Sequence, residues 1–377
     1  MIDLRGRVQQ SGLSIKQLSK RADLPINRIE QLLTGSEPTL MELRKLASAL
    51  RMRISDLLPK TQVEDKAEFL FRKKLDMKVG EKQADVISRL SRFISHSLEF
   101  LPPEKASPAW TRLFEASETT FTEAERLARS FRSEFYDDDQ FGPLLTLPTL
   151  AAEKLNILLL VVPEQAVDGA SAIIAGHVFI FVSPKFEGRM LFTLAHEIAH
   201  CLSHHNADLE YAVFDGVNEV GKLRKRVRDQ EGFADAFASC LLMPAGGVAV
   251  ALKKVREITK TAPSEPVGDI HILYLSRIFG VSFEVSARRC EDLELLPPGG
   301  AYSLAERLRE EFGSPEKRAS TAGLPPRPPV EFPKVPMKLL TAAIEKIKRG
   351  EISVGRASNY LNISLSDLIE AHATSAQ

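Results

Sequence analysis

Short amphipathic helices are the elements predicted for the first sixty residues, because apolar positions recur there at helical spacing. Ser14 is a suitable N-cap for a helix over 15–21, since its hydroxyl can accept from an otherwise unpaired backbone N–H. A second helix is expected over 25–33, where a glycine follows, a third over 39–50, and a short turn capped by Ser55. Two short helices joined by three or four residues are typical of a helix-turn-helix.

A small sheet is expected in the middle of the chain. Six of the seven residues over 156–162 are β-branched or leucine, which is typical of a buried strand. Residues 171–175 and 178–182 have the pattern of a hairpin, whose second strand can offer an edge to an extended peptide. Helical patterns surround these strands, at residues 61–100, 123–135, 190–205, 230–242, 248–258 and 271–279. The pattern therefore predicts an α+β, mostly helical fold.

The C-terminal part changes character at residue 313. Residues 313–336 hold seven prolines in 24 positions without an apolar period, which predicts an exposed linker of polyproline type. The last forty residues are expected to form two short helices, capped by Ser353 and Ser364. The predicted organisation is a helix-turn-helix domain, a helical connector, a central domain, the linker and a small helical tail, at residues 1–60, 61–119, 120–312, 313–336 and 337–377.

Composition excludes several classes of protein. Of the 377 residues, 44% are hydrophobic and 27% are charged, which excludes a wholly disordered chain. The longest dense apolar run, 155–162, is far shorter than the roughly 20 residues of a membrane span, and the N-terminus has no apolar signal region. Three cysteines cannot build a disulfide framework and fit a reducing compartment. We therefore expect a cytoplasmic protein without a membrane partner.

The clearest chemical motif is His196-Glu197-Ile-Ala-His200. Two histidines four residues apart on a helix project from one face, so their nitrogens can bind one Zn²⁺ at about 2.0–2.1 Å. Glu197 follows the first histidine and can reach a water beside the metal without binding the metal itself. The alternative interpretation is an amphipathic helix with two surface histidines.

A third metal ligand is needed, and Glu231 is the candidate. It lies 31 residues after His200, at the start of a second helical pattern, and Asp235 follows four residues later on the same face. This spacing suits a helix that gives Glu231 to the metal and Asp235 to the N–H of a histidine ligand. An ordinary solvated acidic face is the alternative. Candidates for stabilising an oxyanion are left open among His177, Tyr211, His271 and Tyr274.

Two segments, from Leu191 to His200 and from Glu231 to Pro244, together resemble the ImmA/IrrE metallopeptidase family over about residues 120–290. They read LFTLAHEIAH and EGFADAFASCLLMP. The resemblance implies a zincin-like domain of gluzincin type, with zinc bound by the two motif histidines and Glu231 and with Glu197 as general base. It also implies, in several members, cleavage of a repressor that switches on stress or mobile-element genes. Departures are Ala199, where glycine is common, and the long segment 206–230 beside the cleft.

The N-terminal segments 12–22 and 29–35, followed by Pro38, resemble the Xre/phage-repressor helix-turn-helix family over about residues 5–58. The chain has no net charge, with 50 basic and 50 acidic residues, but residues 1–60 hold eleven basic and six acidic ones, a local net of +5. We expect the base edges to be read by Asn27, Arg28 and Gln31, and phosphates to be bound by Lys16, Lys20 and Arg21. A helix-turn-helix that contacts only protein is the alternative.

These observations predict a DNA-binding regulator with zinc-dependent endopeptidase activity on a repressor or another partner protein. Expected partners are duplex DNA, a protein substrate such as a helix-turn-helix repressor or a neighbouring gene's product, and a second copy in a homodimer. The alternative is a non-catalytic repressor or antitoxin-like regulator that uses the zincin fold as a sensor or dimerisation body. Residues 350–364 also look like a small helix-turn-helix, for which docking and DNA contact are equally open.

Overall fold

The computed structural model describes residues 4, 8, 11, 13–50, 52, 57, 61–74, 81–104, 106–136, 139–163, 167–203, 210–216 and 229–374. The chain forms two compact units, residues 1–65 and 66–377, and each is described by itself. The predicted turn at Ser55 lies outside the described residues.

The first unit contains the helices α2, α3 and α4, which span Ile15–Ala22, Ile26–Leu33 and Leu40–Leu50. Ser14 caps α2 as predicted: its hydroxyl accepts from the Gln17 backbone N–H, while the Gln17 side chain accepts from the backbone N–H of Ser14. Leu18, Ile29 and Leu46 are fully buried and hold the helices together. The three predicted helices are therefore confirmed, with Pro25 as the N-cap of α3 rather than its first residue.

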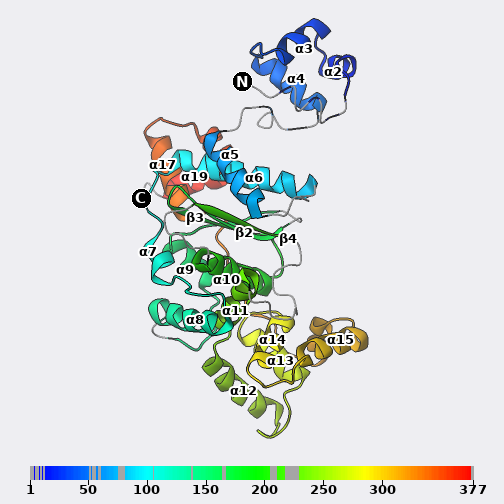
Figure 1. Ribbon diagram of the computed structural model, residues 1–377, viewed down its shortest axis with the longest axis vertical. Coiled ribbons are helices and arrows are strands. Elements are labelled where there is room, and N and C mark those ends of the chain that lie inside the picture. The colour runs from blue at the N-terminus through cyan, green and yellow to red at the C-terminus, as the bar shows by residue number, and fades with distance from the viewer. Residues whose placement is uncertain are drawn as a thin grey trace. The chain divides into compact units, whose positions relative to one another are not determined.

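A four-stranded sheet forms the middle of the second unit (Figure 1). Its strands run in the order β1-β3-β2-β4, and β1 is parallel to β3 while the other pairs are antiparallel. They span Leu158–Val161, Val167–Ile174, His177–Val182 and Tyr211–Gly216 for β1 to β4. The predicted hairpin is confirmed as β2 and β3, but β3 lies inside the sheet and offers no free edge. The outer strand on the β2 side is β4, which the sequence pattern did not predict.

Helices cover both faces of this sheet (Figure 1). On one face lies α10, Glu187–Ser203, which packs against β2 and β3. On the other lies α6, Glu81–Phe100, whose Phe93 ring meets the Phe181 ring of β3 edge-on at 6.1 Å. The charged stretch 61–100 is thus helical over α5 and α6, with α5 at Gln62–Lys74.

The helix α11, Gln230–Leu242, packs between α10 and α8, Phe121–Phe135. Its C-terminal carbonyl groups are bound by two buried arginines: Arg132 Nε donates to the Leu241 carbonyl at 2.6 Å, and Arg289 Nε to the Met243 carbonyl at 2.8 Å. These bonds satisfy carbonyls that a helix end leaves unpaired. The remaining body helices are α7, Ala109–Leu113; α9, Leu147–Glu153; α12, Ala245–Thr259; α13, Asp269–Ile278; α14, Phe283–Asp292; and α15, Gly300–Phe312.

The proline-rich segment 313–336 packs against the body, so the expectation of an exposed linker is wrong. It contains a helix, α16, Pro315–Thr321, and Val330 lies in the main hydrophobic core. Arg277 of α13 donates to the Pro325 carbonyl at 2.8 Å, and Arg327 donates to the Ser276 carbonyl at 3.1 Å. Proline removes N–H donors but leaves carbonyl acceptors, and Arg277 uses one of these, while Arg327 of the segment reaches a carbonyl of the body.

The C-terminal segment forms three helices rather than the expected two: α17, Met337–Lys348; α18, Val354–Leu361; and α19, Leu365–Thr374. Ser353 caps α18 as predicted, accepting from the Arg356 N–H. This segment rests on α6, where the Tyr360 and His96 rings stack at 4.0 Å. Within the described residues, no single helix is both long and apolar enough to cross a membrane, although two sharply bent pairs, α11 with α12 and α13 with α14, meet that test jointly.

Candidate metal centre

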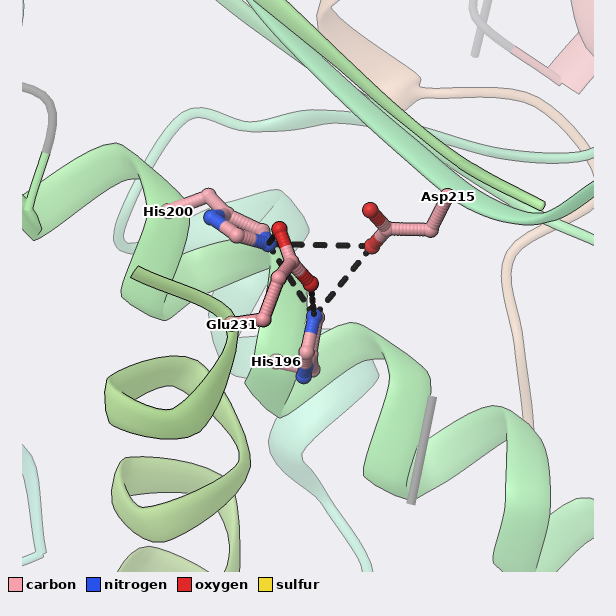
Figure 2. Close-up of side chains that lie close together, drawn as sticks. All are labelled: His196, His200, Asp215 and Glu231. Carbon is pink, nitrogen blue, oxygen red and sulfur yellow. Dashed lines mark hydrogen bonds and ion pairs between the residues drawn. The ribbon is translucent and has the colours of Figure 1, made fainter. Parts of the chain in front are cut away.

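The two motif histidines lie on the buried face of α10. His196 is 1% exposed and His200 is fully buried, because this helix is covered by the sheet on one side and by α11 on the other. Their Nε2 atoms are 3.0 Å apart (Figure 2). The alternative of two surface histidines is therefore excluded.

Glu231 reaches these histidines from the first turn of α11. Asp229 caps that helix by accepting from the Gly232 N–H, which fixes where the helix begins. The Glu231 carboxylate lies 3.4 Å from His196 Nε2 and 3.5 Å from His200 Nε2, and its side chain is 52% exposed. Burial would raise its pKa, but the two imidazoles outweigh that effect and lower the pKa to about 2.

Asp235 lies one turn further along α11 and contacts the other nitrogen of His196. Its Oδ1 is 2.9 Å from His196 Nδ1. An ionised carboxylate can only accept, so Nδ1 carries the proton that is shared with Asp235, and Nε2 is the nitrogen that faces His200 and could bind a metal ion. This is the arrangement that orients a metal-binding histidine.

Asp215, which the sequence analysis did not single out, completes the cluster. It lies on β4 and is 2% exposed, and its Oδ2 is 3.2 Å from His196 Nε2 and 3.7 Å from His200 Nε2 (Figure 2). The side chains of His196, His200, Asp215 and Glu231 each offer a ligand atom within 4.8 Å of the others. The apolar run Tyr-Ala-Val-Phe over 211–214 was a usable signal for this strand, although polar residues surround it.

Glu197 is fully buried beside this cluster, and neither of its carboxylate oxygens accepts a hydrogen bond from the described residues. Gly169 of β2 lies directly over it: a Cβ at that position would be 2.2 Å from Glu197 Oε1 and 2.6 Å from Thr193 Cγ2. Glycine is therefore required for the close approach of strand and carboxylate. Burial, together with the nearby Asp215 carboxylate, holds the pKa of Glu197 well above its ordinary value.

The candidates for an oxyanion donor separate in space. The His177 and His271 rings bond elsewhere, to a backbone carbonyl at 2.8 Å and to a threonine hydroxyl at 2.9 Å. Tyr274 belongs to α13. Tyr211 begins β4, and burial of its hydroxyl, together with the nearby Cys201 and Glu197, raises the pKa of that hydroxyl well above the ordinary value. Tyr211 is thus the candidate that the fold brings to the site.

The donor set fits a zinc ion. Ligand atoms at about 2.0–2.1 Å from a tetrahedral zinc lie about 3.3 Å from one another. The separations between the two histidine nitrogens and between each nitrogen and the two carboxylates are 3.0, 3.2, 3.4, 3.5 and 3.7 Å, which bracket that value. Two imidazoles and two carboxylates are also ligands that zinc accepts.

The predicted DNA-contacting residues all lie in the first unit, but they differ in whether their side chains are exposed or held in an ion pair. Most of them are exposed: Lys16, Lys20, Arg21, Asn27 and Gln31. Arg28 instead forms a bidentate pair within the unit, with its Nε 2.7 Å from Glu42 Oε1 and its Nη2 3.1 Å from Oε2. Its guanidinium is therefore already paired before any base is met.

Comparison with known families agrees with this architecture. A family model described as an IrrE N-terminal-like domain matches residues 152–291, and one described as helix-turn-helix matches residues 4–57. A search of curated proteins finds no match. The first match contains all four residues of the candidate metal centre, and the second covers α2, α3 and α4 of the first unit. The chain therefore joins an Xre-type helix-turn-helix domain to an ImmA/IrrE-like peptidase domain.

Proposed function

We propose that this protein is a cytoplasmic, DNA-binding regulator whose zinc-dependent endopeptidase body cleaves a partner protein. The observation that carries the proposal is the convergence of His196, His200 and Glu231 around one point, with the buried carboxylate of Glu197 beside it. Zinc held there supplies Lewis-acid chemistry, lowering the pKa of water towards about 7 and polarising a carbonyl group.

The chain's own groups perform the proton transfers. Glu197 takes the proton of the attacking water and returns it to the leaving amine. Asp235 holds the His196 ring in the tautomer that leaves Nε2 free for the metal.

DNA binding is proposed for the exposed polar residues of α2 and α3. Asn27 and Gln31 lie on one side of α3 and can pair with adenine edges, while Lys16, Lys20 and Arg21 can bind phosphates. Arg28 remains a candidate for guanine only if it leaves Glu42. The full chain should bind duplex DNA with an affinity that falls steeply between low and moderate salt, and a salt-independent affinity would contradict this.

The proposed substrate is a helix-turn-helix repressor or the product of a neighbouring gene, in a stress or mobile-element response. The support is the resemblance to the ImmA/IrrE family together with the regulator-type N-terminal domain. A homodimer is the form in which helix-turn-helix proteins commonly read paired half-sites.

A second candidate is a non-catalytic regulator that uses the zinc fold as a sensor. The observation that favours it is Asp215, because four protein ligands are typical of a structural rather than a catalytic zinc site. The test is metal content measured together with cleavage of candidate repressors, with Glu197→Gln as the control. Zinc binding with cleavage that this substitution abolishes supports the peptidase. If the wild-type chain and an Asp215 variant both bind stoichiometric zinc and neither cleaves a candidate repressor, the non-catalytic regulator is supported.

A further inference from the structure

The metal cluster holds one carboxylate more than a zinc peptidase needs. A catalytic zinc site has three protein ligands and keeps a fourth position for water or substrate, whereas a closed site has four. Here Asp215 joins the two histidines and Glu231 (Figure 2).

Asp215 is placed as well as Glu231 is. Its Oδ2 is 3.2 and 3.7 Å from the two histidine nitrogens, against 3.4 and 3.5 Å for the Glu231 oxygens. It is also far more buried, at 2% exposure, and its Oδ2 faces the same two histidine nitrogens that a metal ion would bind. A buried carboxylate needs a donor or a cation beside it. Histidines that bind a metal ion through Nε2 cannot donate from that atom, so in a metal-loaded site the ion itself would be the partner of this oxygen.

The strand that carries Asp215 lies where a substrate would be expected. β4 is the outer strand next to β2, and Asp215 pairs with Gly169 of β2, the residue that lies over Glu197. An extended peptide that adds to a free sheet edge forms the same kind of ladder. If β4 were removed, the exposed edge of β2 would lie beside Glu197 and the metal ligands.

We propose that Asp215 is a fourth ligand of the metal and that β4 is an internal latch, which a substrate segment must displace from β2 to open the site. In the resting chain protein ligands would fill all four coordination positions of the metal, so Glu197 would have no metal-bound water to deprotonate. Opening withdraws Asp215 from the metal, frees the edge of β2 and leaves the three-ligand site. This inference rests on the proposed zinc peptidase function and adds its regulation.

The test uses the full chain loaded with cobalt(II) in place of zinc and acetohydroxamate as a probe, because a hydroxamate changes the visible spectrum only where the metal has an open position. The variants are Asp215→Ala and Asp215→Asn, the latter keeping the side-chain volume should alanine unfold the strand. Glu210→Gln is the matched control. It removes a carboxylate next to β4, where Glu210 pairs with Lys66, but it keeps the oxygen that accepts from the Ala175 N–H.

We expect no spectral change in the wild-type and Glu210→Gln chains, and a clear change in the Asp215 variants. Cleavage of a quenched peptide library should likewise rise in the Asp215 variants over the wild type. A wild-type spectrum that responds to the probe as strongly as Asp215→Ala would overturn the latch and leave the zinc peptidase intact. A wild-type chain that takes up neither cobalt nor zinc would overturn the proposed function and the latch together.

Discussion

Replacing Gly169 by alanine tests whether the close approach of β2 to the base is required. The added Cβ would sit 2.2 Å from Glu197 Oε1 and 2.6 Å from Thr193 Cγ2, both fully or nearly fully buried. An ordinary contact is longer by about 1 Å, so the Glu197 carboxylate must move by about that amount. Overpacking of this kind costs about 1–3 kcal/mol of folding free energy, and a 1 Å misplacement of a reacting group costs about 100-fold in rate.

Zinc binding should survive this substitution, because none of the four ligand atoms is within the clash. The assay is denaturant unfolding and zinc stoichiometry for the full chain, with cleavage measured in the Asp215→Ala background. Gly355→Ala is the control: Gly355 lies inside α18 with nothing within 4 Å of its would-be Cβ, so alanine should stabilise by about 0.5–1 kcal/mol. Unchanged stability and unchanged cleavage in Gly169→Ala would refute the packing argument.

Three further outcomes are expected. Glu197→Gln should keep zinc while hydrolysis falls by about 10²–10⁴-fold, and Glu231→Gln should bind zinc more weakly. Zinc stoichiometry measured beside the cleavage rate checks this. Loss of zinc in Glu197→Gln with retention in Glu231→Gln would contradict the assigned roles. Arg28, together with the backbone N–H and hydroxyl of Thr39, lowers the pKa of Glu42 to about 2, so the first unit should lose stability as the pH falls from 4.5 towards 2. Thermal unfolding should show this, and Arg28→Ala should weaken the dependence while an unchanged dependence would contradict the role of Arg28. Burial lowers the pKa of His96 to about 4, so the unfolded state takes up a proton at higher pH than the folded state does. The packing of the C-terminal helices on His96 should therefore weaken as the pH falls from 6.5 to 4. Limited proteolysis should show this weakening, and the His96→Gln chain should lack it.

The two helices of the candidate metal site could be predicted from sequence because their signals are local. The spacing of His196 and His200 fixes their common face, and α11 spans Gln230–Leu242 as expected, since an acidic cap precedes it and a proline follows it. The family matches at residues 4–57 and 152–291 fall inside the expected domains 1–60 and 120–312, whose boundaries stay predictions. The roles of the individual residues remain predictions.

What could not be predicted depends on contacts far apart in the sequence. β4 is a short run within polar residues and exists through its ladder with β2, so the position of Asp215 follows from pairing rather than from local pattern. The segment 313–336 has a linker's composition, yet arginines of α13 and of the segment itself bind backbone carbonyl groups and hold it on the body. Composition reports which hydrogen-bond donors a segment lacks, and it does not report which donors elsewhere will reach its acceptors.

If Asp215 is both a metal ligand and the end of the latch, zinc and an extended peptide must oppose each other. A peptide that displaces β4 removes one ligand, so it weakens zinc binding, and by linkage zinc must weaken the binding of that peptide by the same factor. A suitable probe is a labelled peptide with the sequence of residues 210–216 and alanine in place of the aspartate, because it can form the β2 ladder but cannot replace the ligand. Fluorescence anisotropy should show weaker binding to the zinc-loaded wild-type chain than to the metal-free chain. In Asp215→Ala the strand can leave without breaking a metal bond, so zinc should there have little effect on the peptide. An equal effect of zinc in both chains would mean that β4 and the metal act independently, and the closed site would then belong to a structural zinc centre.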